Sequence, residues 1–178
     1  MRLFKYEGYT LSISEEALCL KPFRAIWVRD KTAKKERAIM ELGYCYFMED
    51  VRSDYQYIID REERSKAIKE GEGLRPDWRP DGTVKEALKL YASFKTTSSL
   101  LLEDTRAMVD GYRNKIRELT SNMADLDVKE VKEVGAIIKQ IPAMVKDLDE
   151  AEKAVTREIA QSDKVRGSQE KSVYEDML

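Results

Sequence analysis

Carboxylates are the most numerous side chains that could do chemistry in this sequence of 178 residues. Carboxylate pairs, which general acid–base catalysis uses, are plentiful and include Glu49 with Asp50, Glu62 with Glu63, and Asp147 with Asp149 and Glu150. Each group lies in a charged helical pattern with basic residues three or four positions away, the spacing of ion pairs on a helix surface. We therefore interpret these carboxylates as solvated surface groups.

Other catalytic groups are scarce. Histidine, the commonest general base and transition-metal ligand, is absent from the sequence. Cys19 and Cys45 lie in apolar helical contexts and are interpreted as buried free thiols. The sequence also has no phosphate-binding glycine loop, calcium-binding loop or Cys-x-x-Cys pair. It therefore predicts a protein that is not an enzyme and that has no catalytic, cofactor-binding or metal-binding residues.

The charges are nearly balanced, with 32 basic and 34 acidic residues, which argues against a general nucleic-acid binder. Residues 21–37 are nevertheless locally basic. An ordinary solvated patch and a surface for an acidic partner, including non-specific contact with DNA, both explain this segment. Its candidate interaction residues are Arg29, Lys31, Lys34, Lys35 and Arg37.

The elements that must position these residues are almost all helical. Residues 1–73 are predicted to form an extended N-terminal arm and short helices, with Ser53 or Asp54 capping the last of them. Residues 74–82, which contain two prolines, read as a connector and as the clearest internal boundary. We expect a long helical hairpin over residues 83–161 and an extended tail over 162–178. No apolar run approaches the roughly 20 residues that a membrane span requires.

The hairpin prediction rests on a seven-residue repeat. Mostly apolar positions recur in steps of four and three from Val84 to Leu119, with Lys95, Ser98 and Thr105 as polar members, which predicts one continuous helix beginning at Thr83. Phe94, Leu101 and Met108 flank this stripe, widening it enough to contact more than one helix. The second helix is predicted to face the first through Val131, Val134, Ile138, Ile141, Val145 and Leu148, and then through Val155 and Ile159.

One feature of this region leaves two alternatives. Pro142 predicts a kink in the second helix, or else a helix boundary near Gln140. We expect an all-α fold, one domain overall, in which the short helices pack on an antiparallel, coiled-coil-like hairpin.

Three candidate contact residues lie outside the basic segment. Trp78, in the middle of the connector, is interpreted as a plug packed on neighbouring helices, with a ligand-stacking platform as the alternative. Arg166 and Tyr174 lie in the predicted tail. This tail either docks on another subunit or frays.

Four stretches of sequence together resemble a known family. They are Lys-Pro-Phe-Arg-Ala-Ile-Trp-Val-Arg-Asp-Lys-Thr (21–32), Leu-Gly-Tyr-Cys-Tyr-Phe-Met-Glu-Asp-Val-Arg-Ser-Asp-Tyr (42–55), Glu-Glu-Arg (62–64) and Lys-Val-Arg-Gly-Ser (164–168). The chain resembles, along nearly its whole length, virion structural proteins of crAss-like and related tailed bacteriophages. It departs from the family pattern at Asp54, where a proline is expected after Ser53.

The resemblance implies a virion protein that is made in the host bacterial cytoplasm. It implies a ring or adaptor protein of the head-to-tail connector, present in about a dozen copies and bound to the portal and to other neck or tail proteins. An internal cargo or scaffolding protein, or a packaging protein that contacts DNA, is the alternative. No membrane partner is expected.

Overall fold

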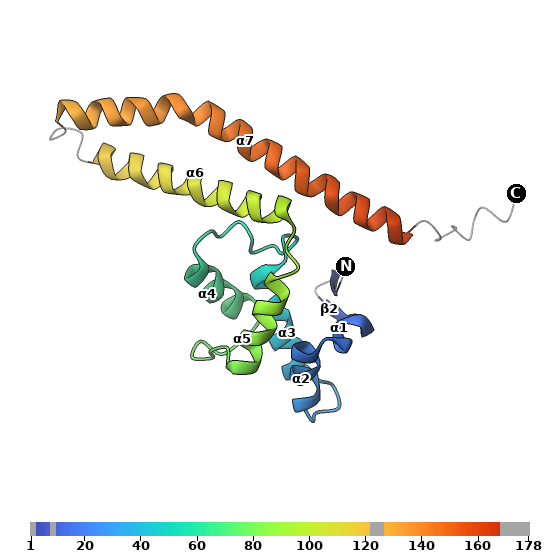
Figure 1. Cartoon of the computed structure of the whole chain (residues 1–178). Coiled ribbons are helices and arrows are strands. Elements are labelled where there is room, and N and C mark those ends of the chain that lie inside the picture. Colours follow the sequence, from blue (N-terminus) through green and yellow to red (C-terminus); the bar gives the residue numbers. More distant parts are fainter. Residues whose placement is uncertain (1–2, 8–9, 122–126, 168–178) are drawn as a thin grey trace, which may run out of the picture. The chain divides into compact units, whose positions relative to one another are not determined.

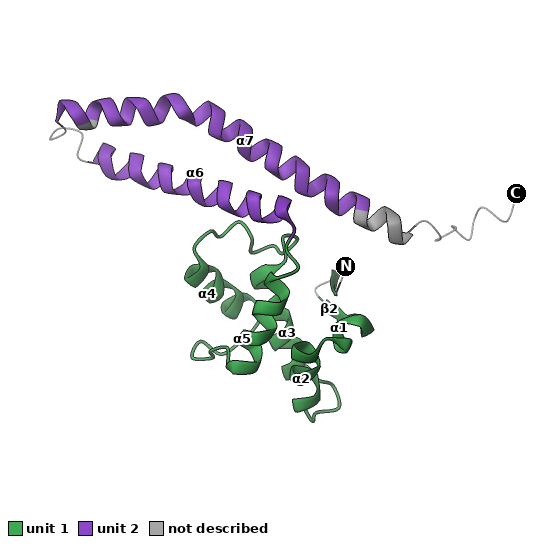
Figure 2. Cartoon of the chain, viewed as in Figure 1, with its two compact units in different colours: residues 1–95 green, residues 96–178 purple. Residues whose placement is uncertain are grey.

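The computed structural model describes residues 3–7, 10–121 and 127–167 of the chain. Within these ranges it is mostly helical, as the sequence predicts, with seven helices and a two-stranded sheet (Figure 1). The elements are β1 (Phe4–Glu7), β2 (Thr10–Ile13), α1 (Glu15–Cys19), α2 (Lys21–Arg29), α3 (Glu36–Glu49), α4 (Arg61–Gly71), α5 (Gly82–Ala92), α6 (Thr97–Ser121) and α7 (Val128–Gly167). They form two compact units, residues 1–95 (unit 1) and 96–178 (unit 2) (Figure 2).

The N-terminal residues form a small sheet in place of a simple extended arm. Strands β1 and β2 are antiparallel, with Phe4 opposite Ile13 and Tyr6 opposite Leu11. Phe4 is buried and stacks on Tyr91 of α5, with ring centroids 5.4 Å apart. The alternation of apolar residues along β1 and β2 therefore places one face of this two-stranded sheet against the core of unit 1.

Local signals set most of the short helices. The Ser14 hydroxyl accepts the backbone N–H of Ala17 at the start of α1, and Pro22 lies in the first turn of α2. The prediction that Ser53 or Asp54 caps the next helix is wrong. Asp60 is the residue that caps α4. The Ser53 hydroxyl instead donates to the Phe47 carbonyl and stabilises a turn that precedes this helix.

The core of unit 1 is built around α3. Every residue from Glu41 to Glu49 is buried, and α2, α4, α5 and β2 all contact this helix. A helix that is covered on all sides belongs to the interior of a domain. Two charged residues, Glu41 and Glu49, are therefore enclosed with the apolar ones.

The predicted boundary at residues 74–82 is wrong. Leu74 is buried, and the Trp78 ring packs edge-on against Tyr44 of α3 at 4.8 Å between centroids. These apolar contacts hold the connector to the core of unit 1, so the proline-rich segment is part of that unit. The division of the chain into units falls after Lys95.

The continuous helix predicted from Thr83 to Leu119 is also wrong, because the chain leaves α5 at Ala92 and enters α6 at Thr97. At the break, the Ser93 hydroxyl donates to the Leu90 carbonyl, and the Thr96 hydroxyl accepts the Ser99 N–H as a cap. Hydroxyl side chains compete with helical backbone bonds in this way. The run Thr96-Thr97-Ser98-Ser99 indicates a helix break in the sequence, but the heptad spacing continues through it and favours a continuous helix.

In unit 2, α6 and α7 pack side by side in antiparallel orientation. Arg106 pairs with Glu152 at 2.9 Å, and the Thr96 hydroxyl donates to Glu158 at 2.9 Å. Helix α7 continues through Pro142 and is bent along its length (Figure 1), so no boundary falls near Gln140. It also extends to Gly167, so residues 162–167 of the predicted tail belong to the helix.

The predicted facing stripe of α7 is only partly right. Its buried residues are Val134, Ile137, Met144, Ala151 and Val155, whereas Val131, Ile138 and Val145 are more than half exposed. The apolar stripe of α7 is three columns wide, and α6 covers two of them. The register therefore lies one column away from the predicted one.

Two neighbouring leucines on α6 test which side of this helix faces α7. Leu102 is 3% exposed, whereas Leu101 is 56% exposed. We expect Leu102→Asp to destabilise unit 2 by several kcal/mol, roughly 3 or more, because it buries an unpaired charge. Leu101→Asp, the control, should change stability by less than about 1 kcal/mol. Thermal and urea unfolding measure both, and equal effects of the two variants would contradict the register.

Candidate interaction surfaces

The arginines of the basic segment are used within unit 1. The Arg29 guanidinium donates to Glu41 at 2.5 Å and to Asp81 at 2.6 Å, and Arg37 donates to Glu41 at 2.9 Å. The carboxylate of Glu41 is 2% exposed. Because Asp81 caps α5, these bonds link α2, α3 and the start of α5.

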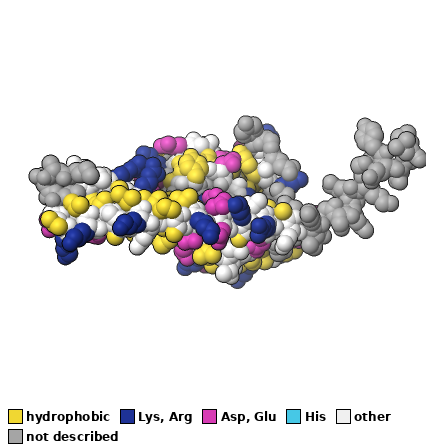
Figure 3. Space-filling view, turned by 90° about the horizontal axis from the view of Figure 1, so that it is seen from above, with side chains coloured by type: hydrophobic (Ala, Val, Ile, Leu, Met, Phe, Trp, Pro, Cys, Tyr) yellow, Lys and Arg dark blue, Asp and Glu magenta, His cyan; other side chains and the backbone are white. Residues whose placement is uncertain are grey.

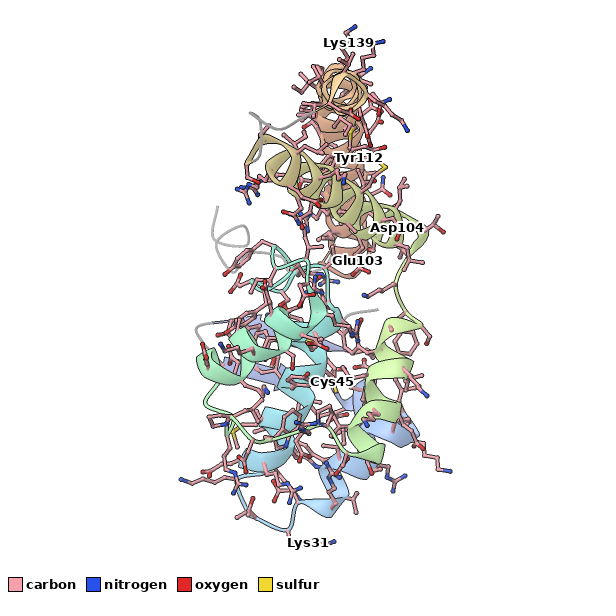
Figure 4. All side chains as sticks on the ribbon, turned by 90° about the vertical axis from the view of Figure 1, so that its left-hand side faces the viewer. Lys31, Cys45, Glu103, Asp104, Tyr112 and Lys139 are labelled. Carbon is pink, nitrogen blue, oxygen red and sulfur yellow. The ribbon has the colours of Figure 1, made fainter. Side chains whose placement is uncertain are left out.

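The lysines of the same segment divide into two kinds. The Lys35 ammonium donates to the backbone carbonyls of Asp30 and Trp27 and closes the loop between α2 and α3. Lys31 and Lys34 are exposed and make no ion pair within the described residues, and Figure 4 shows Lys31 at the outer end of this loop. These two lysines are the part of the segment that is available to an acidic partner.

Asp30 organises this loop through its side chain. The carboxylate accepts the Thr32 N–H at 2.9 Å, the Ala38 N–H at 3.0 Å and the Thr32 hydroxyl at 2.8 Å. Hydrogen bonds from Thr32 and Ala38 stabilise the charged form and lower the pKa of Asp30 from 3.8 to about 2. The low pKa thus reports a structural role of this carboxylate.

The interpretation of Glu49 and Asp50 as solvated carboxylates is wrong. Glu49 is buried and pairs with Arg61 and, at 2.8 Å, with Lys95, whose side chain is 10% exposed. Asp50 accepts the Tyr91 hydroxyl at 2.6 Å. Burial, together with the Asp50 charge, raises the pKa of Tyr91. The missed signal is that Glu41 and Glu49 are eight residues apart, which places them on the same face of α3.

The two cysteine thiols differ in solvent exposure, contrary to the prediction that both are buried. Cys45 lies inside unit 1 (Figure 4), and burial, with smaller effects of Glu49 and Glu41, raises the pKa of its thiol. Such a thiol is unreactive at neutral pH. Cys19, at the end of the short helix α1, is exposed because that position faces away from the core.

The remaining candidate residues have different outcomes. Trp78 packs against Tyr44, whose hydroxyl shares a hydrogen bond with Ser65 at 2.8 Å, as expected of a plug on neighbouring helices. Arg166 lies near the end of α7, and its side chain is outside the described residues. Tyr174 also lies outside the described residues.

Within the described part of the chain, no three cysteine or carboxylate side chains gather closely enough to hold a metal ion. No helix within the same residues has the length and apolar character to cross a membrane.

Unit 2 carries uncovered apolar side chains on both helices. Leu101 and Met108 on α6, and Val131, Ile138 and Val145 on α7, are between 45% and 56% exposed and recur every seventh residue. Figure 3 shows a band of hydrophobic side chains along part of the helix pair, bordered by basic ones. Repeated apolar positions of this kind are typical of a surface that contacts another protein.

Two grooves follow the contact between α6 and α7. One, of about 270 Å³, is lined by Val109, Ile116, Ile141, Met144 and Val145, and the other, of about 460 Å³, by Met108, Gly111, Lys115, Ala136 and Gln140. Tyr112 lines both, whereas the other α6 residues come from opposite sides of the helix. The grooves therefore lie on opposite flanks of the helix pair.

Comparisons of this chain with protein-family models, with curated proteins and with solved structures found no match.

The buried carboxylate on α3 gives the first prediction for unit 1. We expect Glu49→Ala to destabilise unit 1 by about 3 kcal/mol, because it leaves the enclosed Lys95 without this carboxylate. Asp149→Ala removes an exposed pair with Lys153 and, as the control, should cost less than about 1 kcal/mol. Urea unfolding measures both, and a Glu49→Ala variant as stable as the control would contradict a structural role for Glu49.

Asp30 gives a pH-dependent prediction. Its folded pKa of about 2 is below the ordinary 3.8, so its contribution to stability is complete above about pH 4 and is lost as the pH falls through about 2. We expect Asp30→Asn to be less stable than the unaltered chain at pH 7. The difference should shrink between about pH 4 and pH 2 in a series of urea titrations, and a difference that is constant over this range would contradict the assignment.

Proposed function

We propose that this protein is a structural, non-enzymatic component of a tailed-phage particle. Within the particle it is a ring or adaptor subunit of the head-to-tail connector that assembles on the portal, in about a dozen copies. The packing of the short N-terminal helices on the helix pair, and a tail beyond it, belong to this proposal. The sequence stretches at 21–32, 42–55, 62–64 and 164–168, which resemble those of phage virion proteins, give it its biological setting.

One observation carries the proposal. Each helix of unit 2 leaves a column of apolar residues uncovered, so the helix pair is incomplete as an isolated structure. In an assembly, neighbouring subunits cover such apolar columns. A protein that works alone is expected to bury them within its own fold. An assembly role is therefore the function that this geometry supports best.

The charge distribution of unit 1 supports a structural role. The buried or half-buried charges Arg29, Glu41, Glu49, Asp50 and Lys95 bind to one another or to Tyr91 and Asp81, and so join elements of the fold. Groups that catalyse reactions need access to a substrate. The charged groups of unit 1 that are left for a partner are surface ones such as Lys31 and Lys34.

Cryo-electron microscopy of the particle tests the proposal. We expect density for this chain as a ring between the portal and the tail. Density inside the capsid would instead support an internal cargo or scaffolding role, and absence of the chain from purified particles would overturn the proposal.

Native mass spectrometry of the chain with the portal protein provides a second test. We expect a complex that contains several copies of the chain on one portal ring. Isolated connector subunits can stay monomeric until they meet their platform, so the portal must be included. A chain that is monomeric both alone and with portal would contradict the adaptor role, and DNA binding that weakens steeply with salt would favour the packaging alternative.

A further inference from the structure

We propose that residues 173–178 of a second copy of this chain dock in the groove of about 270 Å³ on unit 2. The segment has the sequence Val-Tyr-Glu-Asp-Met-Leu. Its apolar side chains cover the exposed parts of Ile141 and Val145 on α7, and its carboxylates meet Arg113 and Arg117 on α6. This inference deepens the proposed function, on which it rests, by assigning a contact through which subunits associate.

The groove has an apolar wall and a basic margin. Arg113 and Arg117 line it together with apolar residues of both helices, and its accessible lining is apolar. The aliphatic stems of the two arginines therefore belong to the wall, and their guanidiniums lie at the margin. Among the described residues, none that lines this groove is acidic. A segment that fits it is both apolar and negatively charged.

The two guanidiniums are available to such a segment. Arg113 and Arg117 are exposed and make no ion pair within the residues that the structure describes. Three carboxylates on the same flank of the helix pair have other partners: Asp110 accepts the Asn114 amide at 3.0 Å, Glu152 accepts Arg106 at 2.9 Å and Asp149 accepts Lys153 at 2.5 Å. This flank therefore has positive charge that an incoming carboxylate can neutralise.

Residues 173–178 have the composition that this groove requires. They combine four apolar residues with two adjacent carboxylates and contain no basic residue: Val173, Tyr174, Glu175, Asp176, Met177 and Leu178. Arg113 and Arg117 are one helical turn apart, so their long side chains can approach two adjacent carboxylates together. The charges of the segment and of the groove are therefore complementary, and the apolar residues of each can be buried against the other.

The length of the chain identifies a second copy as the source of the segment. Val145, the groove residue of α7 nearest to Gly167, precedes Gly167 by 22 residues, roughly 33 Å along the helix. Tyr174 follows Gly167 by seven residues, and even a fully extended chain spans at most about 25 Å over that length. Val173 and Tyr174 therefore cannot enter the groove of their own chain, and another copy must supply them.

This contact joins two different parts of identical chains. Such a contact is heterologous, and it continues from copy to copy until a ring closes or a filament forms. It also covers part of the apolar column that α7 leaves exposed, because Val145 belongs to that column and lines the groove. The same contact thus accounts for an uncovered surface of unit 2 and provides the repeated association that a ring subunit requires.

Charge reversal in the full chain tests the inference. The first variant, Glu175→Lys with Asp176→Lys, makes the docking segment basic, and the second, Arg113→Glu with Arg117→Glu, makes the margin of the groove acidic. Sedimentation velocity at low salt, up to about 1 mM protein, measures self-association, because even a millimolar Kd leaves about half of the chains paired there. We expect each variant to associate at least about tenfold more weakly than the unaltered chain.

Recombining the reversed charges separates this inference from a general effect of charge. An equimolar mixture of the two variants, and a chain that carries all four substitutions, should recover association, because opposite charges meet again. Lys132→Glu with Lys139→Glu reverses two exposed lysines of α7 that line neither groove and, as the matched control, should associate like the unaltered chain. Circular dichroism melting should show equal stability for all of these chains.

The outcomes distinguish the inference from the function on which it rests. An unaltered chain that stays monomeric at about 1 mM overturns the inference, as does association that either reversed variant retains. Weakened association without recovery in the mixture would also overturn the pairing of the segment with the groove. None of these results removes the chain from the particle, which electron microscopy locates independently.

Discussion

The buried carboxylates of α3 are the constraint on which unit 1 depends. Glu41 and Glu49 lie on the core helix, and a carboxylate enclosed in this way must be matched by cations and hydrogen bonds. Arg29 and Arg37 bind the first, and Arg61 and Lys95 bind the second. These cations come from the end of α2, from α3, from the start of α4 and from the residues just after α5, so the two carboxylates draw the surrounding elements to one helix.

Unit 2 is organised by a different interaction. Its two helices meet through apolar residues such as Leu102, Val134 and Met144, with exposed or half-buried ion pairs such as Arg106–Glu152 at the margin. Apolar packing is non-directional, so two helices whose stripes are each three columns wide cover two columns and leave the third. The surplus columns give unit 2 surfaces for a neighbour, whereas unit 1 uses its charges internally.

This division of roles suits a building block. A unit whose directional charge pairs specify one packing supplies a defined body, and a helix pair with uncovered apolar columns supplies surfaces for a neighbour. These features support the proposed role in an assembly.

The sequence by itself determined the helical class, the cap at Ser14, the helix start at Pro22, and the two long apolar stripes, because these depend on neighbours along the chain. Only the tertiary structure decided that Glu49 is buried, that the helix breaks before Thr97, that residues 74–82 belong to unit 1 and which column of α7 faces α6. Each of these depends on partners distant in the sequence. Periodicity shows how wide an apolar stripe is, but the partner helix selects the columns that it covers.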